Sequence, residues 1–367
     1  MLMIKATRDA ILRPLQMVAG IVERRHTLPI LANVLIRKRG EQVSFLATDI
    51  EIQIETSAAI GAGAEEAAVT VNTRKLIDIL RALPEAEVSL SLSGKRLTLS
   101  AGKSRFQLQT LGPEEFPTVA PNDNPTVDLS MPQKQLRQLL AMVHFAMAQQ
   151  DIRYYLNGLL PVVDGPQLKA VATDGHRLAY CASAITPGQS RADIIIPRKT
   201  ITELQRLLAD SEDPVQLRIA GNQARFKFGE VELLTKLVEG KFPDYQRVIP
   251  TGYTKSITLS REAWAGSLQR ASILTSEKFK GVRFTLSDHA LRIQTSNAEQ
   301  EEAIEELDVD YSGEALDVGF NVTYLLDALT NLKSDQVRVE FGDSNTSALL
   351  SVPGEDTFKY VVMPMRI

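Results

Sequence analysis

The segment "VNTRKLIDIL" (Val71–Leu80) is similar to two later segments, and this similarity decides the fold. They are "IPRKTITELQ" from Ile196 and "FNVTYLLDAL" from Phe320, so that the spacing is about 125 residues each time. Two further sets of positions keep this spacing: Asn33, Asn157 and Lys280, and Asp49, Asp174 and Asn297. Because several features agree on one period, the sequence predicts three copies of a single unit.

Each copy contains two helical patterns. The first helix of each copy has an apolar stripe, at Ile11, Leu15 and Val18, at Leu136, Leu139, Leu140, Val143 and Met147, and at Trp264, Leu268 and Ala271. The second helix has one at Leu76, Leu80 and Leu83, at Ile201, Leu204 and Leu208, and at Leu325, Leu329 and Leu332. In the first helix of the second copy, Ser130 with Gln133 predicts a capping box, and Ser260 predicts a cap for the first helix of the third copy. In the first copy, Pro14 interrupts the first helical pattern and weakens it.

Alternating segments from Arg105, Arg225, Leu291 and Val337 predict half-buried strands. The fold class is therefore α+β, with three similar domains that each pack two helices on mostly antiparallel sheet. We expect the domains at residues 1–125, 126–253 and 254–367. Three equal units in a row form either an open arc or part of a ring, and a head-to-tail dimer would close six domains into a ring.

The composition, 44% hydrophobic and 23% charged, is typical of a soluble globular protein. The amino terminus lacks the pattern of a secretory signal, and no apolar run approaches the length of a membrane span, so we expect a cytoplasmic protein without a membrane partner. A single cysteine, Cys181, excludes an intrachain disulfide. The histidines share no ligand spacing, so a structural zinc site is not expected: His26, His144, His176 and His289.

A formal net charge of −4 argues against a nucleic-acid partner, but the charge is unevenly placed. Residues 299–310 include no basic residue and these acidic ones: Glu299, Glu301, Glu302, Glu305, Glu306, Asp308 and Asp310. The rest of the chain then has an excess of positive charge and could present a basic face. The acidic run could bind a divalent metal or form a solvated or interface-facing surface.

Two glycine motifs lack the context that a nucleotide site needs. "GKS" at Gly102–Ser104 would need a glycine at position 97, which is Leu97. "GAGAEE" from Gly61 has Glu66 where a dinucleotide-binding motif needs its third glycine. We therefore predict neither an ATP site nor a dinucleotide site. The basic run Arg37–Arg39 is expected at the tip of an exposed strand.

The segment "VATDGHRLAY" (Val171–Tyr180) has the composition of a catalytic loop. In one interpretation, His176 is a general base that the Asp174 carboxylate orients. In the other, a strand ends in an Asp-Gly turn, with His176 and Arg177 as partly buried edge residues. No nucleophile motif accompanies the cluster, which favours the turn.

Several strings together carry a resemblance to a known family: "QQDIRYYLNGLL", "ATDGHRLA", "PRK" at Pro197, "GKFPDYQRVIP", "NAEQEEAIEE", "GFNVTYLLDAL" and "YVVMPMRI". In order and over essentially the full chain, they resemble the bacterial beta sliding clamps, the processivity subunits of DNA polymerase III. Two departures are small: Asn72 and Thr73 stand where the family more often has Pro-Ala, and Ile367 replaces the common final Leu.

The resemblance implies a ring-shaped homodimer around double-stranded DNA, which is held by topology without sequence preference. It implies no catalysis and no cofactor. The expected partners are a clamp loader, the DNA polymerase III alpha subunit, and other polymerases or repair proteins that bind through short peptide motifs.

The resemblance also implies three sets of site residues. The peptide pocket is expected at Leu156, Thr173, Gly175, His176, Arg177, Leu178, Pro243, Arg247, Val248, Asn321, Tyr324, Ser347, Val361, Met363, Pro364, Met365 and Arg366. DNA contacts are expected from Arg25, Arg74, Gln149, Gln150, Tyr154, Tyr155, Arg198 and Lys199. The dimer interface is expected at Lys75, Arg96, Lys103, Arg105, Ile273, Leu274, Glu299, Glu301 and Glu302.

Three alternatives remain at this point. Tyr154 and Tyr155 could stack on single-stranded bases or pack as ordinary strand residues. The chain could be a nuclease or hydrolase that uses Asp174, His176 and an acidic metal site. It could also be a monomeric relative of the clamps that binds partners without encircling DNA.

Overall fold

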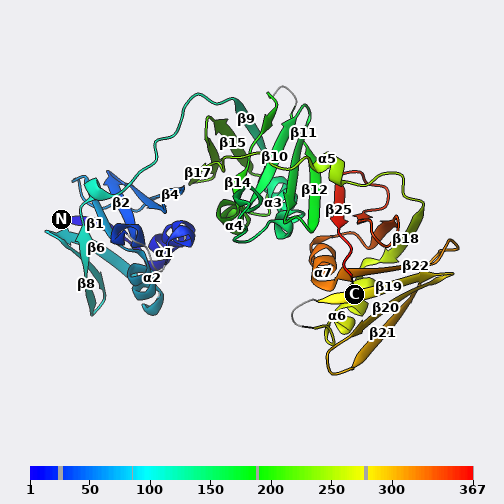
Figure 1. Ribbon diagram of the computed structural model, residues 1–367. Coiled ribbons are helices and arrows are strands. Elements are labelled where there is room, and N and C mark those ends of the chain that lie inside the picture. Colours follow the sequence, from blue (N-terminus) through cyan, green and yellow to red (C-terminus); the bar gives the residue numbers. More distant parts are fainter. Residues whose placement is uncertain (24–27, 85, 187–189, 277–279, 367) are drawn as a thin grey trace. The chain divides into compact units, whose positions relative to one another are not determined.

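The computed structural model describes residues 1–23, 28–84, 86–186, 190–276 and 280–366 (Figure 1). The chain divides into two compact units. The first comprises Met1–Leu136 and Thr202–Leu237, and the second comprises Arg137–Ile201 and Val238–Ile367.

Within the described residues, the strands of the first unit form one sheet in the order β1-β6-β7-β8-β5-β2-β3-β4-β17-β16-β15-β9. These strands are β1 (Leu2–Thr7), β2 (Asn33–Arg39), β3 (Gln42–Thr48), β4 (Ile52–Ala59), β5 (Ala67–Asn72), β6 (Glu87–Ser93), β7 (Arg96–Ala101), β8 (Ser104–Leu111), β9 (Val127–Pro132), β15 (Pro214–Ala220), β16 (Gln223–Phe228) and β17 (Val231–Lys236). The helices α1 (Arg8–Val18) and α2 (Thr73–Ala82) pack against each other (Figure 1). Helices α3 (Gln133–Ala141) and α4 (Arg198–Leu207) each have residues in both units.

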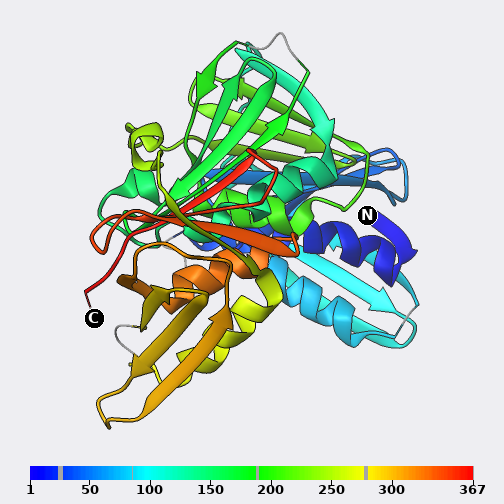
Figure 2. The ribbon, with the colours of Figure 1, turned by 90° about the vertical axis from the view of Figure 1, so that its right-hand side faces the viewer.

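The second unit has two sheets in the part of the chain that is described. The larger has the order β13-β10-β11-β12-β25-β24-β23-β18 with β14 beside β10, and the smaller has the order β21-β20-β19-β22. The strands are β10 (Gly158–Asp164), β11 (Gln167–Thr173), β12 (Arg177–Ala184), β13 (Ala192–Asp193), β14 (Ile196–Pro197), β18 (Lys255–Ser260), β19 (Gly281–Ser287), β20 (Ala290–Ser296), β21 (Glu302–Asp308), β22 (Leu316–Asn321), β23 (Gln336–Phe341), β24 (Ala348–Ser351) and β25 (Phe358–Val362). The helices α6 (Arg261–Ser272) and α7 (Val322–Asn331) lie side by side, with α6 next to β20 and β21 (Figure 2), and α5 (Tyr245–Val248) is a single turn.

The strand pairing repeats three times, which confirms the prediction of three similar units. The strands β1, β9 and β18 each run directly into a helix, and they pair with β6, β15 and β23 in turn. The strands β5, β14 and β22 also run directly into a helix, and they pair with β2, β10 and β19. The pairing is antiparallel throughout these six pairs, so the predicted α+β class with two helices in each repeat is confirmed.

The same comparison of repeats identifies two strand edges. β4 pairs with β17, and β12 pairs with β25. β21 occupies the position of β4 and β12 in the third repeat, and β8 occupies the position of β17 and β25 in the first. Among the described strands, β21 pairs only with β20, while β8 pairs with β7 and, through its last two residues, with β5. Most of β8 is exposed, so the prediction that the segment from Arg105 is half-buried is wrong.

For the first helix of each repeat, the sequence predicted a cap or an interrupting proline, and one of the two predicted caps is confirmed. Ser260 caps α6 as predicted, because its hydroxyl accepts a hydrogen bond from Ala263 N at 3.3 Å. Ser130 does not cap α3, because it lies inside β9, and the side chain of Gln133 instead accepts a hydrogen bond from Ala209 N. α1 continues through Pro14, because the apolar face on which this proline lies is buried and this packing outweighs the lost backbone hydrogen bond.

Lys38 corrects the prediction of an exposed basic strand tip. The strand β2 lies inside the sheet between β5 and β3, and Lys38 is only 1% exposed. Its ammonium group donates hydrogen bonds to Gly63 O and Glu65 O, both at 2.7 Å. A buried charge needs such partners, so Lys38 fixes the connection between β4 and β5 instead of facing solvent.

The two glycine motifs lie in loops that lead into strands. Gly102 and Lys103 form the turn between β7 and β8, and the segment from Gly61 to Glu66 connects β4 to β5. A phosphate-binding loop of either kind leads into a helix. The structure therefore agrees with the exclusion of both nucleotide motifs.

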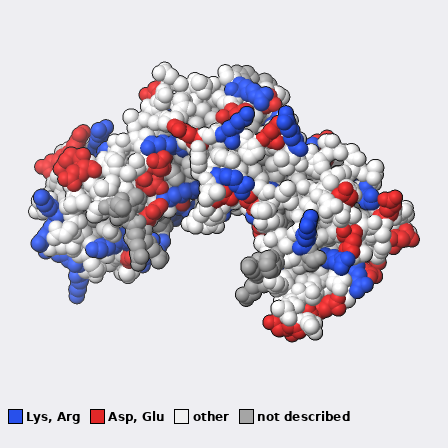
Figure 3. All heavy atoms as spheres, viewed as in Figure 1, with Lys and Arg blue, Asp and Glu red and all other residues white. Residues whose placement is uncertain are grey.

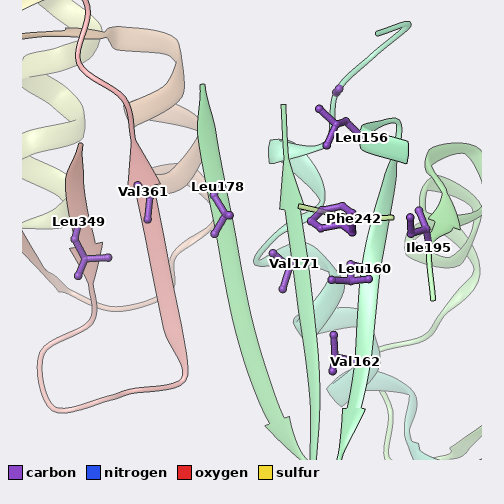
Figure 4. Packing of buried hydrophobic residues seen from close by; sticks show 10 residues of the cluster. Leu156, Leu160, Val162, Val171, Leu178, Ile195, Phe242, Leu349 and Val361 are labelled. Atoms are coloured by element: carbon purple, nitrogen blue, oxygen red, sulfur yellow. The ribbon is translucent and has the colours of Figure 1, made fainter. Parts of the chain in front are cut away.

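A core cluster of the second unit spans neighbouring strands of the larger sheet (Figure 4). Leu349 on β24 stands opposite Val361 on β25, and Val361 stands opposite Leu178 on β12. Leu156 and Phe242 extend the cluster beyond the strands. The result is a continuous buried apolar layer that extends to Leu178, near the end of the sheet where β11 turns into β12.

Candidate functional site

A pocket of about 160 Å³ lies at this end of the larger sheet in the second unit. Its apolar floor includes the buried side chains of Leu178 and Val361, and Met363 at its side is 48% exposed. The full lining is Arg153, Tyr155, Leu156, Thr173, Gly175, His176, Arg177, Leu178, Pro243, Val248, Val361 and Met363.

The turn between β11 and β12 forms one wall of the pocket and is fixed by its own side chains. Thr173 Oγ1 donates to Arg177 O at 2.6 Å and accepts from Gly175 N at 3.1 Å. Asp174 Oδ1 accepts from the backbone amides of His176 and Arg177 at 2.9 and 3.1 Å. Gly175 has φ +91°, a conformation that favours glycine. The turn is therefore held by hydrogen bonds from its own side chains.

This geometry favours the turn interpretation over a catalytic pair. The Asp174 carboxylate bonds the backbone amide of His176 and the guanidinium of Arg177, so it is engaged in the turn. Burial raises the pKa of the Cys181 thiol to about 12, so that residue is not a thiolate at neutral pH. Arg177 is partly buried as predicted, but His176 is exposed, and neither residue lies at a sheet edge because β12 lies between β11 and β25.

The Arg177 side chain bonds groups both inside and outside this turn. Its Nε donates to Asp174 Oδ2 at 3.0 Å, its Nη1 to Asp327 Oδ2 at 2.6 Å, and its Nη2 to Phe145 O at 2.7 Å. The guanidinium carbon lies 4.4 Å from the centre of the Tyr324 ring, within the range of a cation–π contact. The guanidinium is therefore held by the protein itself.

The loop before β10 forms a second wall. Asp151 accepts three hydrogen bonds from Arg153, one of them from its backbone amide, and the side chain of Asn157 bonds Asp151 N and O. Arg153 Nη2 also donates to Asp174 O at 3.1 Å, which ties this loop to the turn. Hydrogen bonds from Arg153 lower the pKa of Asp151 to about 2. The exposed Ile152 and Tyr154 thus belong to an ordered loop.

Ten of the residues expected in a peptide pocket line this one, and the other seven lie outside its lining: Arg247, Asn321, Tyr324, Ser347, Pro364, Met365 and Arg366. Arg247 is an exposed residue of α5 that pairs with Asp244. Asn321 caps α7, and Ser347 O accepts a hydrogen bond from Tyr253. Met365 N donates to Gly319 O.

Sequence reasoning did not assign Arg153 or Asp327 to any site, and it assigned Tyr155 to DNA. Arg153 follows Asp151 by two residues, a spacing at which a short loop allows an ion pair, so the sequence held a usable signal. Asp327 is a mid-helix residue distant in sequence from Arg177, and only the fold brings the two together.

A second hollow of about 310 Å³ is also lined by residues of the turn and is mainly polar. It shares His176 and Arg177 with the pocket, and the Arg198 side chain donates to Met147 O at 2.9 Å beside it. The full lining is Phe145, Met147, Ala148, Gln149, Asp151, Asp174, His176, Arg177, Arg198 and Tyr324.

The residues expected at DNA lie in several places. Gln149, Gln150 and Tyr154 are exposed on the loop before β10, where Gln150 has φ +56°. Tyr154 and Tyr155 form a short 3₁₀ turn with their rings 5.8 Å apart, so the alternative of strand packing is wrong. Arg74 is exposed on α2, Arg198 and Lys199 begin α4, and Arg25 lies outside the described residues.

The residues expected at a dimer interface are mostly exposed. Arg96, Lys103 and Arg105 lie on or between β7 and β8, and Lys75 lies on α2. Ile273, at the end of α6, is 76% exposed, while Leu274 is half-buried. Glu299, Glu301 and Glu302 lie at the start of β21 or before it. Acidic side chains gather over the lower end of the β19–β22 sheet in the view of Figure 3.

The structure also bears on metal and membrane binding. Among the residues that it describes, no three side chains of the metal-ligating types converge on one point, and the acidic run lies along an edge strand. In the same residues, no helix is both long and apolar enough to cross a bilayer.

Three repeats, an apolar pocket and two strand edges that lack a counterpart among the described strands define a repeat-built binding protein. Family models of the DNA polymerase III beta subunit match its N-terminal domain to residues 2–120, its central domain to residues 130–244 and its C-terminal domain to residues 246–366. The chain therefore belongs to the DNA polymerase III beta subunit family, the beta sliding clamps, which are non-enzymatic processivity factors.

Individual relatives are similar over nearly the full length. The beta sliding clamp of Pseudomonas putida is 46% identical over 362 residues, 98% of either chain. That of Escherichia coli K12 is 41% identical over 361 residues, again 98% of either chain. A crystal structure of the DNA polymerase III subunit beta from Pseudomonas aeruginosa has a TM-score of 0.95 at 45% identity and covers 99% of this chain and 100% of its own. That of the Caulobacter crescentus sliding clamp has a TM-score of 0.92 at 35% identity and covers 100% of both.

Proposed function

We propose that two copies of this chain close head to tail into a ring around double-stranded DNA. The ring tethers the replicative polymerase and other DNA-processing proteins to their template and so gives processivity. Each copy contributes three domains, at residues 1–125, 126–253 and 254–367. The protein acts in the cytoplasm, where the DNA is.

The observation that carries this proposal is that the edges of β8 and β21 have no counterpart among the described strands. Within one chain, β4 pairs with β17 and β12 pairs with β25, so each repeat joins the next through the same kind of strand pair. β21 of one copy and β8 of another would form the third pair of this kind and leave no free edge at either junction.

Charge and apolar surface at these edges support the pairing. β8 and its neighbouring turn carry Arg105 and Lys103, whereas β21 is preceded by Glu299 and Glu301. Opposite charges fix the register of two surfaces and suppress wrong partners. Ile273, 76% exposed, supplies an apolar centre that a second copy would cover.

DNA is held mainly by enclosure in this proposal. Arg25, Arg74, Arg198 and Lys199 attract phosphates without reading sequence, while Gln149, Gln150, Tyr154 and Tyr155 contact DNA from their loops. Tyr154 suits stacking on an unpaired base, because 57% of it is exposed. These contacts weaken with salt, whereas enclosure does not.

The pocket in the second unit receives a short peptide from a polymerase, the clamp loader or a repair protein. Its buried floor at Leu178 and Val361 suits apolar side chains of the peptide, and Met363 adapts its shape to different sequences. The seven expected residues outside this lining remain predicted contacts of the bound peptide.

Retention on circular DNA tests the proposed ring. The protein is loaded on nicked circular DNA with a clamp loader and ATP, freed of unbound protein by gel filtration, and the DNA is then linearised. We expect retention on the circle and loss after linearisation. Retention that survives linearisation would mean direct binding and would contradict the ring.

Two rival functions predict other results. A monomeric clamp relative would sediment with the mass of one chain at micromolar concentration. A nuclease or hydrolase would show metal-dependent activity that His176→Ala abolishes, and the engaged Asp174 carboxylate argues against it.

A further inference from the structure

We propose that Asp327 is a positioning residue for the pocket: it holds the guanidinium of Arg177, and through Arg177 it holds the turn of residues 174–176 in the shape that receives a peptide. This inference rests on the peptide-binding role proposed above. It assigns Arg177 a structural part in that role, in place of a direct contact with the bound peptide.

The first step is that Arg177 has little left to offer a peptide. Each of its three nitrogens already donates to an oxygen of the protein, at 3.0 Å to Asp174, 2.6 Å to Asp327 and 2.7 Å to Phe145 O. Its side chain is only 10% exposed, and the Tyr324 ring lies against the guanidinium.

The second step concerns where these partners come from. Asp174 belongs to the same turn as Arg177, and the Phe145 carbonyl belongs to the short 3₁₀ turn that follows α3. Asp327 and Tyr324 lie one helical turn apart on α7, which belongs to the C-terminal family domain, whereas Arg177 belongs to the central one. Asp327 is therefore the charged group by which α7 fixes the turn.

The third step is electrostatic. A guanidinium that is buried to this extent is stable only when carboxylates or carbonyls compensate it, and removing one partner leaves an uncompensated buried charge. Asp174 already accepts two backbone amides in addition to Arg177 Nε. Without the Asp327 charge, Nη1 loses its carboxylate partner and Arg177 is free to change its conformation.

The last step links Arg177 to the pocket. Thr173 Oγ1 donates to Arg177 O, and His176 O accepts from Met363 N at 2.9 Å. Leu178, the next residue, is part of the pocket floor. A shift of Arg177 thus reaches three parts of the pocket lining, although Asp327 itself is not among the lining residues.

The test uses the full-length protein and a fluorescent synthetic peptide that carries the clamp-binding motif of a DNA polymerase III alpha subunit. Asp327→Asn keeps the shape of the side chain and removes its charge. We expect the Kd of the peptide to rise about tenfold, which is within the range of mutations that act on a site through its supporting contacts. The matched control is Asp317→Asn. Asp317 lies on β22 and pairs with Arg283 on β19, and neither residue lines the pocket, so we expect this loss of charge to leave the Kd unchanged.

A double-mutant cycle separates positioning from a general loss of stability. In an Arg177→Met background, Asp327→Asn has no further effect on the Kd if Asp327 acts through Arg177. An equal Kd for wild type and Asp327→Asn would overturn the inference, and so would an undiminished effect in the Arg177→Met background. A wild-type protein that does not bind the peptide would instead contradict the proposed function of the pocket.

Discussion

The guanidinium of Arg206 on α4 donates a hydrogen bond to Met17 O at the carboxyl-terminal end of α1, with an Nη2–O distance of 2.6 Å. Nη1 donates to Gln16 O at 3.1 Å, and Nε and Nη2 also bond Glu203 Oε2. A helix ends with unsatisfied carbonyl groups and partial negative charge, which a cation stabilises. Arg206 therefore joins a helix of the first repeat to one of the second, next to the β4–β17 pair.

Replacing Arg206 should weaken this junction. In Arg206→Met, two carbonyl groups of α1 lose their donor and the Glu203 carboxylate, only 8% exposed, loses its ion pair. We expect the free energy of unfolding to fall by about 2 kcal/mol. The measurement is the urea midpoint of the first unfolding transition. Arg13→Met, which removes an exposed arginine of α1, is the control and should leave the midpoint unchanged; equal midpoints for both variants would contradict the assignment.

Lys38 should be as important for stability as a core residue. Lys38→Met keeps the aliphatic length but leaves Gly63 O and Glu65 O without their donor, so we expect a loss of about 2 kcal/mol in the free energy of unfolding. The neighbouring Arg39 is exposed on the same strand, and Arg39→Met should have almost no effect. Thermal unfolding of the two variants side by side is sufficient, and a Lys38→Met protein that melts with the wild type would show that the two carbonyls find water instead.

Much of the fold was predictable because the sequence pattern of one structural unit occurs three times in the chain. The apolar stripes of the second helices at Leu76, Ile201 and Leu325 are buried as predicted, since a 3.6-residue period has one structural meaning on an amphipathic helix. The predicted cap at Ser130 was wrong because a capping pattern is local and also fits the last residues of a strand. The prediction that Lys38 is exposed was wrong because the strand order decides whether a strand is internal. No local sequence pattern reveals that order.

The candidate site was predictable only through family resemblance. The residues 173–178 are contiguous in the sequence, and the turn that they form has recognisable chemistry in Thr173, Asp174 and Gly175. Asp327 is distant in sequence from Arg177, and an isolated aspartate on a helix carries no signal of its partner. Long-range ion pairs of this kind depend on how the repeats pack, so they emerge only from the structure.

The loop that holds Arg153 should respond to acid in a defined window. Hydrogen bonds from Arg153 lower the pKa of Asp151 to about 2 from its ordinary value of 3.8. A carboxyl group whose pKa is lower in the folded state stabilises the fold above its unfolded pKa, and this contribution is lost as the pH falls through the folded value. The stabilising effect of the pair is therefore complete above about pH 4 and declines toward pH 2.

Carboxyl-selective NMR titration of Asp151 checks this expectation. In the wild type the midpoint should lie near pH 2, and in Arg153→Gln it should move up toward 3.8. Asp164 is the internal control. A hydrogen bond from Lys169 lowers the pKa of Asp164, and its titration should be the same in both proteins. A wild-type midpoint at the ordinary value would mean that Arg153 and Asp151 do not stay paired in solution.

Charge reversal at Arg105 should loosen the proposed dimer. Arg105 lies on β8, whose residues 104–109 pair only with β7 among the described strands, and the opposing edge in the proposed ring carries Glu299, Glu301 and Glu302. In Arg105→Glu, an attraction becomes a repulsion between like charges, which costs about 1 kcal/mol or more at a partly desolvated interface. The dimer dissociation constant should then rise at least about fivefold, and more at low salt than at high salt.

Arg39→Glu makes the same change in net charge on β2 and should leave dimerisation intact. Sedimentation velocity over a concentration series measures both constants, and an unchanged constant for Arg105→Glu would remove β8 from the interface.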